Sequence, residues 1–475
     1  MRSSQCWSDA CLNSFAIHRS LIFALQRGRS RNTLLSTRSI KSHSAVQGAL
    51  GQAQLLIIVV SERSTIVGPT PIMGHPLVAE KNRFFTLDAI SRTQLDPEQR
   101  ELFLDNLKRF LKEEVAPHYD EWESASIWPR SLWRRLGEEG FLCVDLPEAY
   151  GGYGVSFELS GAIVEEVSRA GFGALASGLS VHSDIVAPYI LNLGSEEQRQ
   201  VWLPKMVTGE AVGAIGMTEP GAGSDLQGIR TTATKDGDDY CINGQKTFIT
   251  NGQHCDVLVL AAKTNPAEGA KGITLFTVDA SKPGFNRGRN LEKMGLHSGD
   301  TSELFFEDLE VSAADILGGE GKGFYNMMNE LPRERLILGI GCVGAAEGAF
   351  ELAVDYVHER QAFGASIASF QNTRYKLAEM KTEIELNRAL AEKYVTKFMD
   401  GELSSAEASM LKLAASEMQG RVVDQCLQMF GGYGYMSEYP ISRAYVDARI
   451  QRIYGGTSEI MKELVSRSIL PSNSR

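Results

Sequence analysis

The sequence predicts an α+β protein with an N-terminal helical domain, a middle β domain and a C-terminal helical bundle. Apolar residues recur at helical spacing from Asp96 onward and again beyond Gly323, whereas the region between Glu210 and Val311 contains runs of strand composition separated by Gly, Asp and Pro turns. Helices and strands do not alternate, and no GxGxxG follows a strand, so a Rossmann fold is not expected. The predicted divisions are an extension over residues 1–82, a helical domain over 83–210, a β domain over 211–315 and a helical domain over 316–475.

The N-terminal extension differs in composition from the rest of the chain. Residues 1–72 hold eight Lys and Arg against two Asp and Glu, so they carry a charge of +6 while the remainder carries −17. A segment rich in Ser and Arg and poor in acids is typical of an organellar transit peptide. A wrongly assigned upstream start codon explains it as well, because the run from Met73 onward would make a sensible start. The protein is expected in the mitochondrial matrix in the first case, and in the cytoplasm if it is bacterial.

Length and composition exclude several classes of protein. At 475 residues, two or three domains are expected. The acidic body argues against a nucleic-acid partner. The seven cysteines show no CxxC pair or metal-ligand spacing, so reduced thiols and no metal site are expected. The longest fully apolar run, Leu55–Val60, is far shorter than the roughly 20 residues that span a bilayer, which predicts a soluble protein with no membrane span.

The first helices have recognisable start signals. Asp96 is a predicted N-cap, Pro97 occupies the first helical position and Gln99 the capping-box position. Ser195 opens a later helix by the same logic, and Pro204 and Gly209 are expected to end this region. The apolar face of the first helix is formed by Phe103, Leu107, Phe110, Leu111 and Val115.

Three strands are expected over residues 257–264, 273–280 and 302–311, which read VLVLAAKT, ITLFTVDA and SELFFEDLEV. Beyond Gly323 the helical period returns. One long helix there is marked by Leu377, Met380, Ile384, Ala391, Tyr394, Val395 and Phe398.

One stretch combines the features of a ligand-binding loop. Ile215–Asp225 reads IGMTEPGAGSD, in which Gly221 and Gly223 allow positive φ and close backbone approach, while Thr218 and Ser224 offer hydroxyls beside free backbone N–H groups. Composition alone fits an ordinary Gly/Pro turn equally well. A second string, QKTFITNG over residues 245–252, follows a turn and a short strand and places an aromatic side chain beside a hydroxyl.

Together the two strings resemble the flavin-binding middle of the acyl-CoA dehydrogenase family, and the resemblance extends from about Phe85 to the C-terminus. It implies FAD as cofactor, a barrel-like middle domain, and a flavin ring between that domain and the C-terminal helices, with its adenine half reaching a neighbouring subunit. It also implies α,β-dehydrogenation of acyl-CoA thioesters to trans-2-enoyl-CoA in fatty-acid β-oxidation: a base removes a proton from Cα and a hydride passes from Cβ to flavin N5.

The position of that base departs from the commoner family pattern. Many members carry the glutamate in a string like YEGT, but here Gly455 replaces it. The stretch ELPRERL over residues 330–336 resembles ELPQERL of long-chain acyl-CoA dehydrogenases, and its base matches Glu334. Alternatively Glu334 is a solvated acid paired with Arg333, Arg335 or Lys322. Glu330 and Glu459 are the rival acids.

The remaining site residues come from the same resemblance. The isoalloxazine contacts are Met217, Thr218, Ser224, Phe248, Ile249 and Thr250, and the contacts to the pyrophosphate and adenosine are Arg360 and Gln371. Further FAD contacts are Gln428, Met429, Phe430, Gly431 and Gly432, in a loop that approaches the cofactor of a partner subunit, and Thr457, Ser458 and Glu459. The substrate contacts are Ser224, Tyr325, Pro332, Arg333, Arg335, Gly455 and Gly456.

The resemblance implies a homotetramer, a dimer of dimers, that passes electrons from the acyl-CoA substrate to an electron-transferring flavoprotein. Three alternatives stay open: a branched-chain acyl-CoA dehydrogenase, a flavin oxidase or monooxygenase on the same scaffold, and a catalytically silent binding partner. Acyl-CoA oxidases are usually longer, and Glu334 argues against the silent relative. His254 and His297 have no assigned role.

Overall fold

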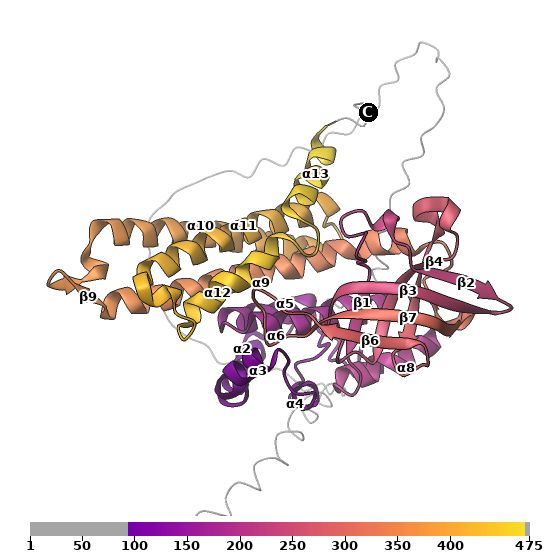
Figure 1. The fold of residues 1–475 in the computed structure, drawn as a ribbon. Helices are drawn as coiled ribbons and strands as arrows, with labels where there is room; N and C mark the ends of the chain where they lie inside the picture. Colours follow the sequence, from indigo (N-terminus) through magenta and orange to yellow (C-terminus); the bar gives the residue numbers. More distant parts are fainter. Residues whose placement is uncertain (1–93, 471–475) are drawn as a thin grey trace, which may run out of the picture. The chain divides into compact units, whose positions relative to one another are not determined.

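The computed structural model describes residues 94–470, so the predicted extension over residues 1–82 lies outside the described part of the chain. That part begins with helices, continues with a β-sheet and ends with long helices (Figure 1), as predicted. The first helices are α2 (Pro97–Phe110), α3 (Tyr119–Ala125), α4 (Ser131–Glu138), α5 (Phe157–Arg169), α6 (Gly173–Leu179), α7 (Ala187–Leu193) and α8 (Glu196–Val207), with a π-helical turn, η4 (Ser180–Val186), joining α6 to α7.

Most of the predicted helix start and end signals are found in the structure, with two differences. The Asp96 carboxylate caps α2 by accepting a hydrogen bond from the N–H of Glu98 at 2.9 Å, so the cap uses Glu98 rather than the capping-box position Gln99. Ser195 and Gln198 form the predicted capping box at the start of α8. Pro204 does not end that helix, which continues to Val207, because one missing N–H costs a single backbone hydrogen bond.

The middle of the chain forms one eight-stranded sheet. Its order is β6-β7-β3-β2-β4-β5-β8, with β1 pairing in parallel to β4, and the path is open because β6 and β8 are its two ends. The three predicted strands are confirmed as β4, β5 and β7. The strands are β1 (Gly213–Gly216), β2 (Thr232–Asp236), β3 (Asp239–Thr250), β4 (Val257–Lys263), β5 (Ile273–Asp279), β6 (Phe285–Asn290), β7 (Thr301–Ser312) and β8 (Ile316–Leu317).

Strand β3 is longer than the short strand that the sequence predicts, and it includes most of the QKTFITNG string. Its pairing with β7 shifts register between Lys246 and Ile249, which is a β-bulge. Phe248 lies in that bulge with φ +60°, and its ring is 67% exposed. The bulge therefore turns an aromatic side chain out of the sheet at the end where a ligand was expected.

The C-terminal helices lie side by side, with the sheet toward one end of them and the small β9–β10 hairpin at the other (Figure 1). Helix α9 packs against α5 and α11. A Cβ on Gly344 or Gly348 would collide with backbone carbonyls of α5, so these glycines allow close approach of the two helices. The elements are α9 (Gly323–Glu359), β9 (Gln361–Ala362), β10 (Ala365–Ser366), α10 (Gln371–Met399), α11 (Ser405–Phe430), α12 (Pro440–Ala448) and α13 (Ser458–Ile469).

Two helical segments, Gly173–Leu193 and Gly323–Glu359, are long and apolar enough by length and composition to cross a membrane. Both pack within the protein, where 83% and 56% of the tested residues are buried, and the second contains buried ionisable residues. Their hydropathy is that of core helices. The five cysteines in the described part of the chain, at 143, 241, 255, 342 and 426, are free thiols.

Candidate active site

The carboxyl group of Glu334 lies inside the protein on α9. The residue is 6% exposed, and the Tyr189 hydroxyl of α7 donates a hydrogen bond to its Oε1 at 3.0 Å. No Lys or Arg forms an ion pair with Glu334 among residues 94–470. Burial raises its pKa to about 7, against the lowering effects of Tyr189 and Arg335. The alternative of a solvated, surface-paired acid is therefore wrong.

A second buried acid, Glu330, lies one helical turn earlier on α9. The Asn192 side chain of α7 donates to both of its carboxylate oxygens at 3.1 Å. Burial raises the pKa of Glu330 to about 7, and the nearby Glu334 charge also raises it. Helix α7 thus supplies one donor to each of two buried acids.

The two arginines beside Glu334 have different surroundings. Arg333 donates to Asp145 at 2.7 Å and to Asp184 at 3.3 Å, and its guanidinium lies over the Phe157 ring. This internal network occupies Arg333, so the structure does not place it as the predicted substrate contact; a buried guanidinium needs carboxylate partners. Arg335 lies on the other side of the helix.

Arg335 lies near the Gly455–Gly456 segment. Its guanidinium donates to the hydroxyls of Ser405 and Ser409, and its Nε has no partner among the described residues. Lys412 of α11 donates to the Gly456 carbonyl at 2.6 Å. Gly455 has φ +63°, and a Cβ there would collide with Leu338 Cδ1. The backbone at Gly455 is thus held in a conformation that favours glycine.

A cavity of about 500 Å³ begins one turn beyond Glu334 and follows α9. Ile337, Leu338 and Gly341 line its near end, together with Tyr454, which directly precedes Gly455. Small residues line its middle from α9 and from α6. Its far end along α9 is lined by Glu351, Leu352 and Asp355, so that end carries charged groups. Because a helix rises 1.5 Å per residue, the span from residue 337 to residue 352 is about 22 Å.

The two flavin-like strings come together at the ends of β1 and β3. The Thr247 N–H donates to the Thr218 carbonyl at 2.9 Å. Lys246 is fully buried and donates to the Met217 carbonyl at 3.1 Å and to Glu219 at 2.8 Å. Burial lowers the pKa of Lys246 to about 8. This buried pair fixes the backbone of the loop that follows β1.

Some residues of these strings lie differently from the prediction. Gly221 and Gly223 have no positive φ, and a Cβ on either would meet nothing within 4 Å, so they contribute open space rather than an unusual backbone. The Ile249 side chain packs in the core of the sheet, so only its backbone could reach a cofactor. Ser224 is exposed and Thr250 is half-buried.

A second group of predicted cofactor residues surrounds the β9–β10 hairpin. The Arg360 guanidinium lies 5.6 Å from the centroid of the Tyr433 ring, and the Gln371 side chain donates to Tyr375. Phe430 is buried and stacks on Tyr356 at 4.0 Å, so its side chain is occupied within its own chain. Gln428, Gly431 and Gly432 are exposed, whereas Met429 is half-buried.

The remaining predicted residues lie at helix starts. Thr457 is the N-cap of α13, where its hydroxyl accepts from the Ile460 N–H, and Ser458 is buried and donates to Glu417 at 2.7 Å. Glu459 is exposed, and so is Tyr325, at 56%. Pro332 is buried inside α9. Neither Glu459 nor Tyr325 lies in the buried cluster around Glu334.

Three family models match almost the whole described part of the chain. The N-terminal domain model of acyl-CoA dehydrogenase matches residues 97–210, the middle domain model 214–309 and the C-terminal domain model 321–470. A curated relative, the mitochondrial long-chain specific acyl-CoA dehydrogenase of Sus scrofa, is 48% identical over 374 residues, which cover 78% of this chain and 86% of that protein.

The chain belongs to the acyl-CoA dehydrogenase family.

Solved structures agree with this assignment. An acyl-CoA dehydrogenase from Geobacillus kaustophilus is 48% identical, with a TM-score of 0.77 over 79% of this chain and 99% of that one. A glutaryl-CoA dehydrogenase from Mycobacterium smegmatis, solved in complex with FADH2, is 28% identical, with a TM-score of 0.75 over 80% of this chain and 97% of that one. The protein is an acyl-CoA dehydrogenase, a flavoprotein oxidoreductase of fatty-acid metabolism.

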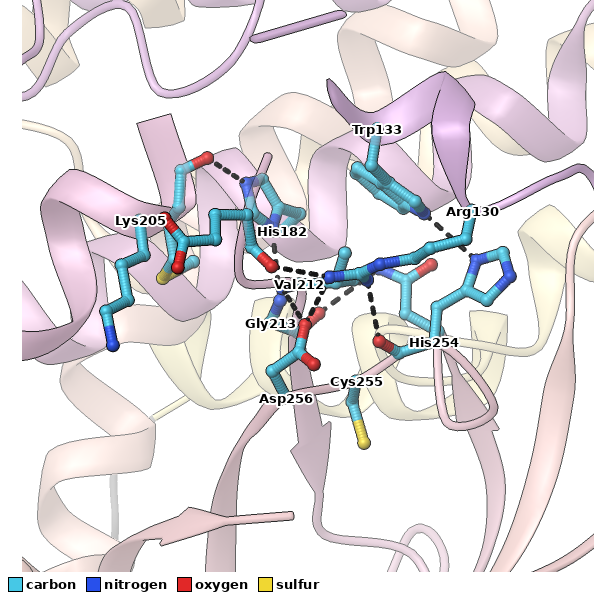
Figure 2. Close-up of polar contacts among 12 residues, drawn as sticks. Arg130, Trp133, His182, Lys205, Val212, Gly213, His254, Cys255 and Asp256 are labelled. Atoms are coloured by element: carbon cyan, nitrogen blue, oxygen red, sulfur yellow. Dashed lines mark hydrogen bonds and ion pairs between the residues drawn. The ribbon is translucent and has the colours of Figure 1, made fainter. Parts of the chain in front are cut away.

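No role was predicted for His254 from the sequence. In the structure it belongs to a polar network that ties α4 to the sheet. Figure 2 shows the Arg130 guanidinium donating to the His254 carbonyl at 2.8 Å and to Asp256 at 2.5 Å, while the Trp133 indole N–H donates to His254 Nδ1 at 3.0 Å. Asp256 also accepts from the Val212 N–H at 2.8 Å. The network fixes the start of β1 and the loop that follows β3.

Asn251 ties the same strands to helix α6. Its side-chain amide donates to the Gly178 carbonyl of α6 at 3.0 Å and to the Gly213 carbonyl of β1 at 3.2 Å. Like Tyr189 and Lys246, it was missed because its partners are distant in sequence. Its place directly after QKTFIT was the only signal available.

Proposed function

We propose that this acyl-CoA dehydrogenase converts long-chain acyl-CoA thioesters to trans-2-enoyl-CoA in fatty-acid β-oxidation, with Glu334 as the base that removes the α-proton. The observation that carries the proposal is the Glu334 carboxyl group, which is buried without an ion pair to any described residue. It lies one helical turn before a cavity whose α9 wall is apolar from Ile337 to Ala349. Burial raises the pKa of this carboxylate toward neutrality, and a general base works best when its pKa lies near the working pH.

The residues present fit FAD as cofactor. Phe248 offers an exposed aromatic face beside the Met217–Thr218 loop, and Cβ atoms on Gly221 or Gly223 would meet nothing within 4 Å. Met217, Thr218, Ser224, Phe248 and the backbone around Thr250 would hold the isoalloxazine. FAD bound there would supply the acceptor for the hydride that leaves Cβ of the substrate.

The chain's own residues handle the proton and the developing charge. Glu334 takes the α-proton onto its carboxylate, and the electron pair of the Cα–H bond moves into the substrate's new double bond as Cβ is oxidised. The Gly455 backbone N–H donates a hydrogen bond to the thioester oxygen and stabilises its developing negative charge. The positive φ of Gly455 and the hydrogen bond from Lys412 to the Gly456 carbonyl hold this N–H in place. Glu334 is itself buried, which keeps bulk water away from its carboxylate.

The cavity supports a long acyl chain as substrate. Its path of about 22 Å along α9 accommodates an extended fatty acyl group, and its middle is lined by small side chains. A branched-chain substrate, the alternative within this family, would need a short, wide pocket near Glu334. The second alternative, an oxidase or monooxygenase, receives no support from a particular feature of the described residues.

The predicted FAD contacts fall into two separate groups, and their separation supports assembly of more than one subunit. The Met217–Phe248 group lies at the sheet, whereas Arg360, Gln371 and Gly431–Gly432 lie at the hairpin end of the C-terminal helices (Figure 1). Helix α10 alone, 29 residues long, spans about 43 Å between these ends. One FAD therefore needs the hairpin of a second subunit, which supports an oligomer. The homotetramer, a dimer of dimers, and the electron-transferring flavoprotein as acceptor are proposed from the family resemblance.

The location of the protein depends on the role of residues 1–72. A mitochondrial matrix enzyme is supported by their transit-like composition and by the mitochondrial name of the pig relative, and a cytoplasmic enzyme follows if the protein is bacterial. N-terminal sequencing of the mature protein from its native source distinguishes the two.

The function is tested with purified protein and a panel of straight and branched acyl-CoA thioesters. The protein should bind about one FAD per chain, and anaerobic addition of palmitoyl-CoA should bleach the flavin and yield the trans-2-enoyl product. A folded protein that cannot be reconstituted with FAD contradicts the proposal. Bleaching by isovaleryl-CoA but not by palmitoyl-CoA favours the branched-chain alternative.

A further inference from the structure

Two side chains of one helix donate hydrogen bonds to the two buried acids of α9. Tyr189 and Asn192 lie one turn apart on α7, and Glu330 and Glu334 lie one turn apart on α9. The Tyr189 hydroxyl donates to Glu334 Oε1 at 3.0 Å, while the Asn192 amide donates to both oxygens of Glu330. The two acids therefore differ: both carboxylate oxygens of Glu330 accept a hydrogen bond, but only one oxygen of Glu334 does.

We propose that Tyr189 is a positioning residue of this enzyme, whose hydroxyl holds one oxygen of the Glu334 carboxylate and leaves the other oxygen free to take the α-proton of the substrate. The inference deepens the proposed function and rests on Glu334 being the base. Proton transfer needs a carboxylate oxygen within hydrogen-bond reach of the Cα–H, and a side chain with several rotatable bonds is held there only by a specific partner.

A core tyrosine with a satisfied hydroxyl is the simpler explanation, and the nature of the acceptor argues against it. Tyr189 is 0% exposed, so its hydroxyl needs a partner. Its partner is a buried carboxylate for which Tyr189 is the one hydrogen-bond donor among residues 94–470. By comparison, the hydroxyl of the buried Tyr394 donates only to the sulfur of Met410, at 3.7 Å.

The charged groups around Glu334 leave this role to Tyr189. Arg335 lowers the pKa of Glu334 but directs its own hydrogen bonds to Ser405 and Ser409. From α11, Lys412 donates to the Gly456 carbonyl. On the α7 side, Arg333 is neutralised by Asp145 and Asp184, and Glu330 is held by Asn192.

Loss of the Tyr189 hydroxyl should shift the pKa of Glu334 in a predictable direction. A hydrogen bond to the charged form favours that form, so Tyr189→Phe should raise the pKa of Glu334 above about 7. The base must be ionised to act, and the acidic limb of the pH profile should therefore move to higher pH. A variant that merely loosened the core would lose rate equally at every pH.

The test compares Tyr189→Phe with wild type and with Tyr394→Phe, which removes a hydroxyl from another buried helical tyrosine. Flavin reduction by palmitoyl-CoA is followed anaerobically in the holoenzyme across the pH range. Tyr189→Phe should move the acidic limb up by about one to two pH units, so that reduction slows by about tenfold or more below the limb and recovers above it. Tyr394→Phe should follow the wild-type profile. An unshifted limb in Tyr189→Phe overturns the inference.

A second readout does not depend on turnover. The carbonyl stretch of protonated Glu334, assigned by its loss in Glu334→Gln, is titrated by infrared difference spectroscopy in wild type and Tyr189→Phe, and should titrate at higher pH in the variant. If Tyr189→Phe does not fold, 3-fluorotyrosine at position 189 provides a stronger donor of similar shape and should move both titrations to lower pH. Unmoved titrations overturn the inference.

The same experiments separate this inference from the proposed function. If Glu334→Gln reduces flavin at the wild-type rate, Glu334 is not the base and both proposals fail. If Glu334→Gln is inactive while the limb of Tyr189→Phe stays in place, the base is correct and only the role of Tyr189 is overturned.

Discussion

At the scale of single residues, Glu334 differs from most other buried acids in how little the protein neutralises it. Most buried carboxylates among residues 94–470 have a cationic partner or backbone donors: Asp184 has Arg333, and Glu219 has Lys246 and two N–H groups. Glu334 has one neutral hydroxyl. A carboxylate left this way stays basic, which is the property that a proton-abstracting base needs.

The base position can be moved only if the space at Gly455 is changed. A glutamate at Gly455 would adopt φ near +63°, at a cost of about 1–2 kcal/mol, and its Cβ would meet Leu338 Cδ1. We expect Gly455→Glu in a Glu334→Gln background to stay nearly inactive, and added Leu338→Ala to restore part of the rate of anaerobic flavin reduction. Leu338→Ala alone is the control for its effect on the cavity. A triple variant no faster than Glu334→Gln would show that the two positions do not flank the same proton.

The sequence predicted the identity of these residues better than their orientation. Glu334 was found because the ELPRERL string resembles a family motif, and burial then distinguished it from a solvated acid. Arg333, Ile249 and Phe430 were included as contacts, but each side chain packs inward. Motif matching gives no side-chain direction. Tyr189 lies 145 positions from its partner, a pairing that only the tertiary fold creates.

At the scale of elements, α9 combines the proposed base with one wall of the cavity. Its first half carries Glu334, and its second half lines the cavity and packs against α5 through glycine. The role of the second half was not evident in the sequence, since a small residue in a helix fits close packing and pocket lining equally well. The helical and strand patterns themselves were predictable; the bulge that exposes Phe248 was not, because it depends on pairing with β7.

Filling the middle of the cavity should change chain-length preference. Ala345 lines the cavity from α9. We expect Ala345→Phe to lower kcat/KM for palmitoyl-CoA by about a hundredfold while butyryl-CoA changes only a few-fold, because the added ring blocks the path beyond the first carbons. Ala345→Ser, which adds little volume, is the matched control. Equal losses for both substrates would mean that the acyl chain does not follow α9.

At the scale of the whole molecule, the two groups of predicted FAD contacts lie far apart in one chain, which is why we propose that a partner subunit completes the site. The domain boundaries at 82, 210 and 315 stay a prediction, as do the oligomeric state and the electron acceptor. The oligomeric state and the acceptor cannot be derived from one chain's sequence, because each depends on surfaces that meet in an assembly.

The exposed hairpin provides the test of assembly. Phe363 at its turn is 98% exposed, although it is a large apolar side chain. We expect Phe363→Asp to reduce the oligomer in sedimentation velocity and to lower FAD retained per chain, since a charge there is incompatible with an apolar interface. Leu102→Asp, at an exposed apolar position on α2, should do neither. A Phe363→Asp protein that is monomeric and keeps its FAD would contradict the shared cofactor site.

The most direct test of the central claim is the rate at which Glu334→Gln transfers electrons from substrate to flavin in a single anaerobic turnover. Glutamine keeps the shape of the side chain and removes its basicity, so FAD and palmitoyl-CoA should still bind while flavin bleaching slows by about a thousandfold or more. Glu330→Gln, the matched change one turn away, should retain most of the rate. If Glu334→Gln bleaches its flavin at the wild-type rate across acyl-CoA chain lengths, the base lies elsewhere and the account of this active site is wrong.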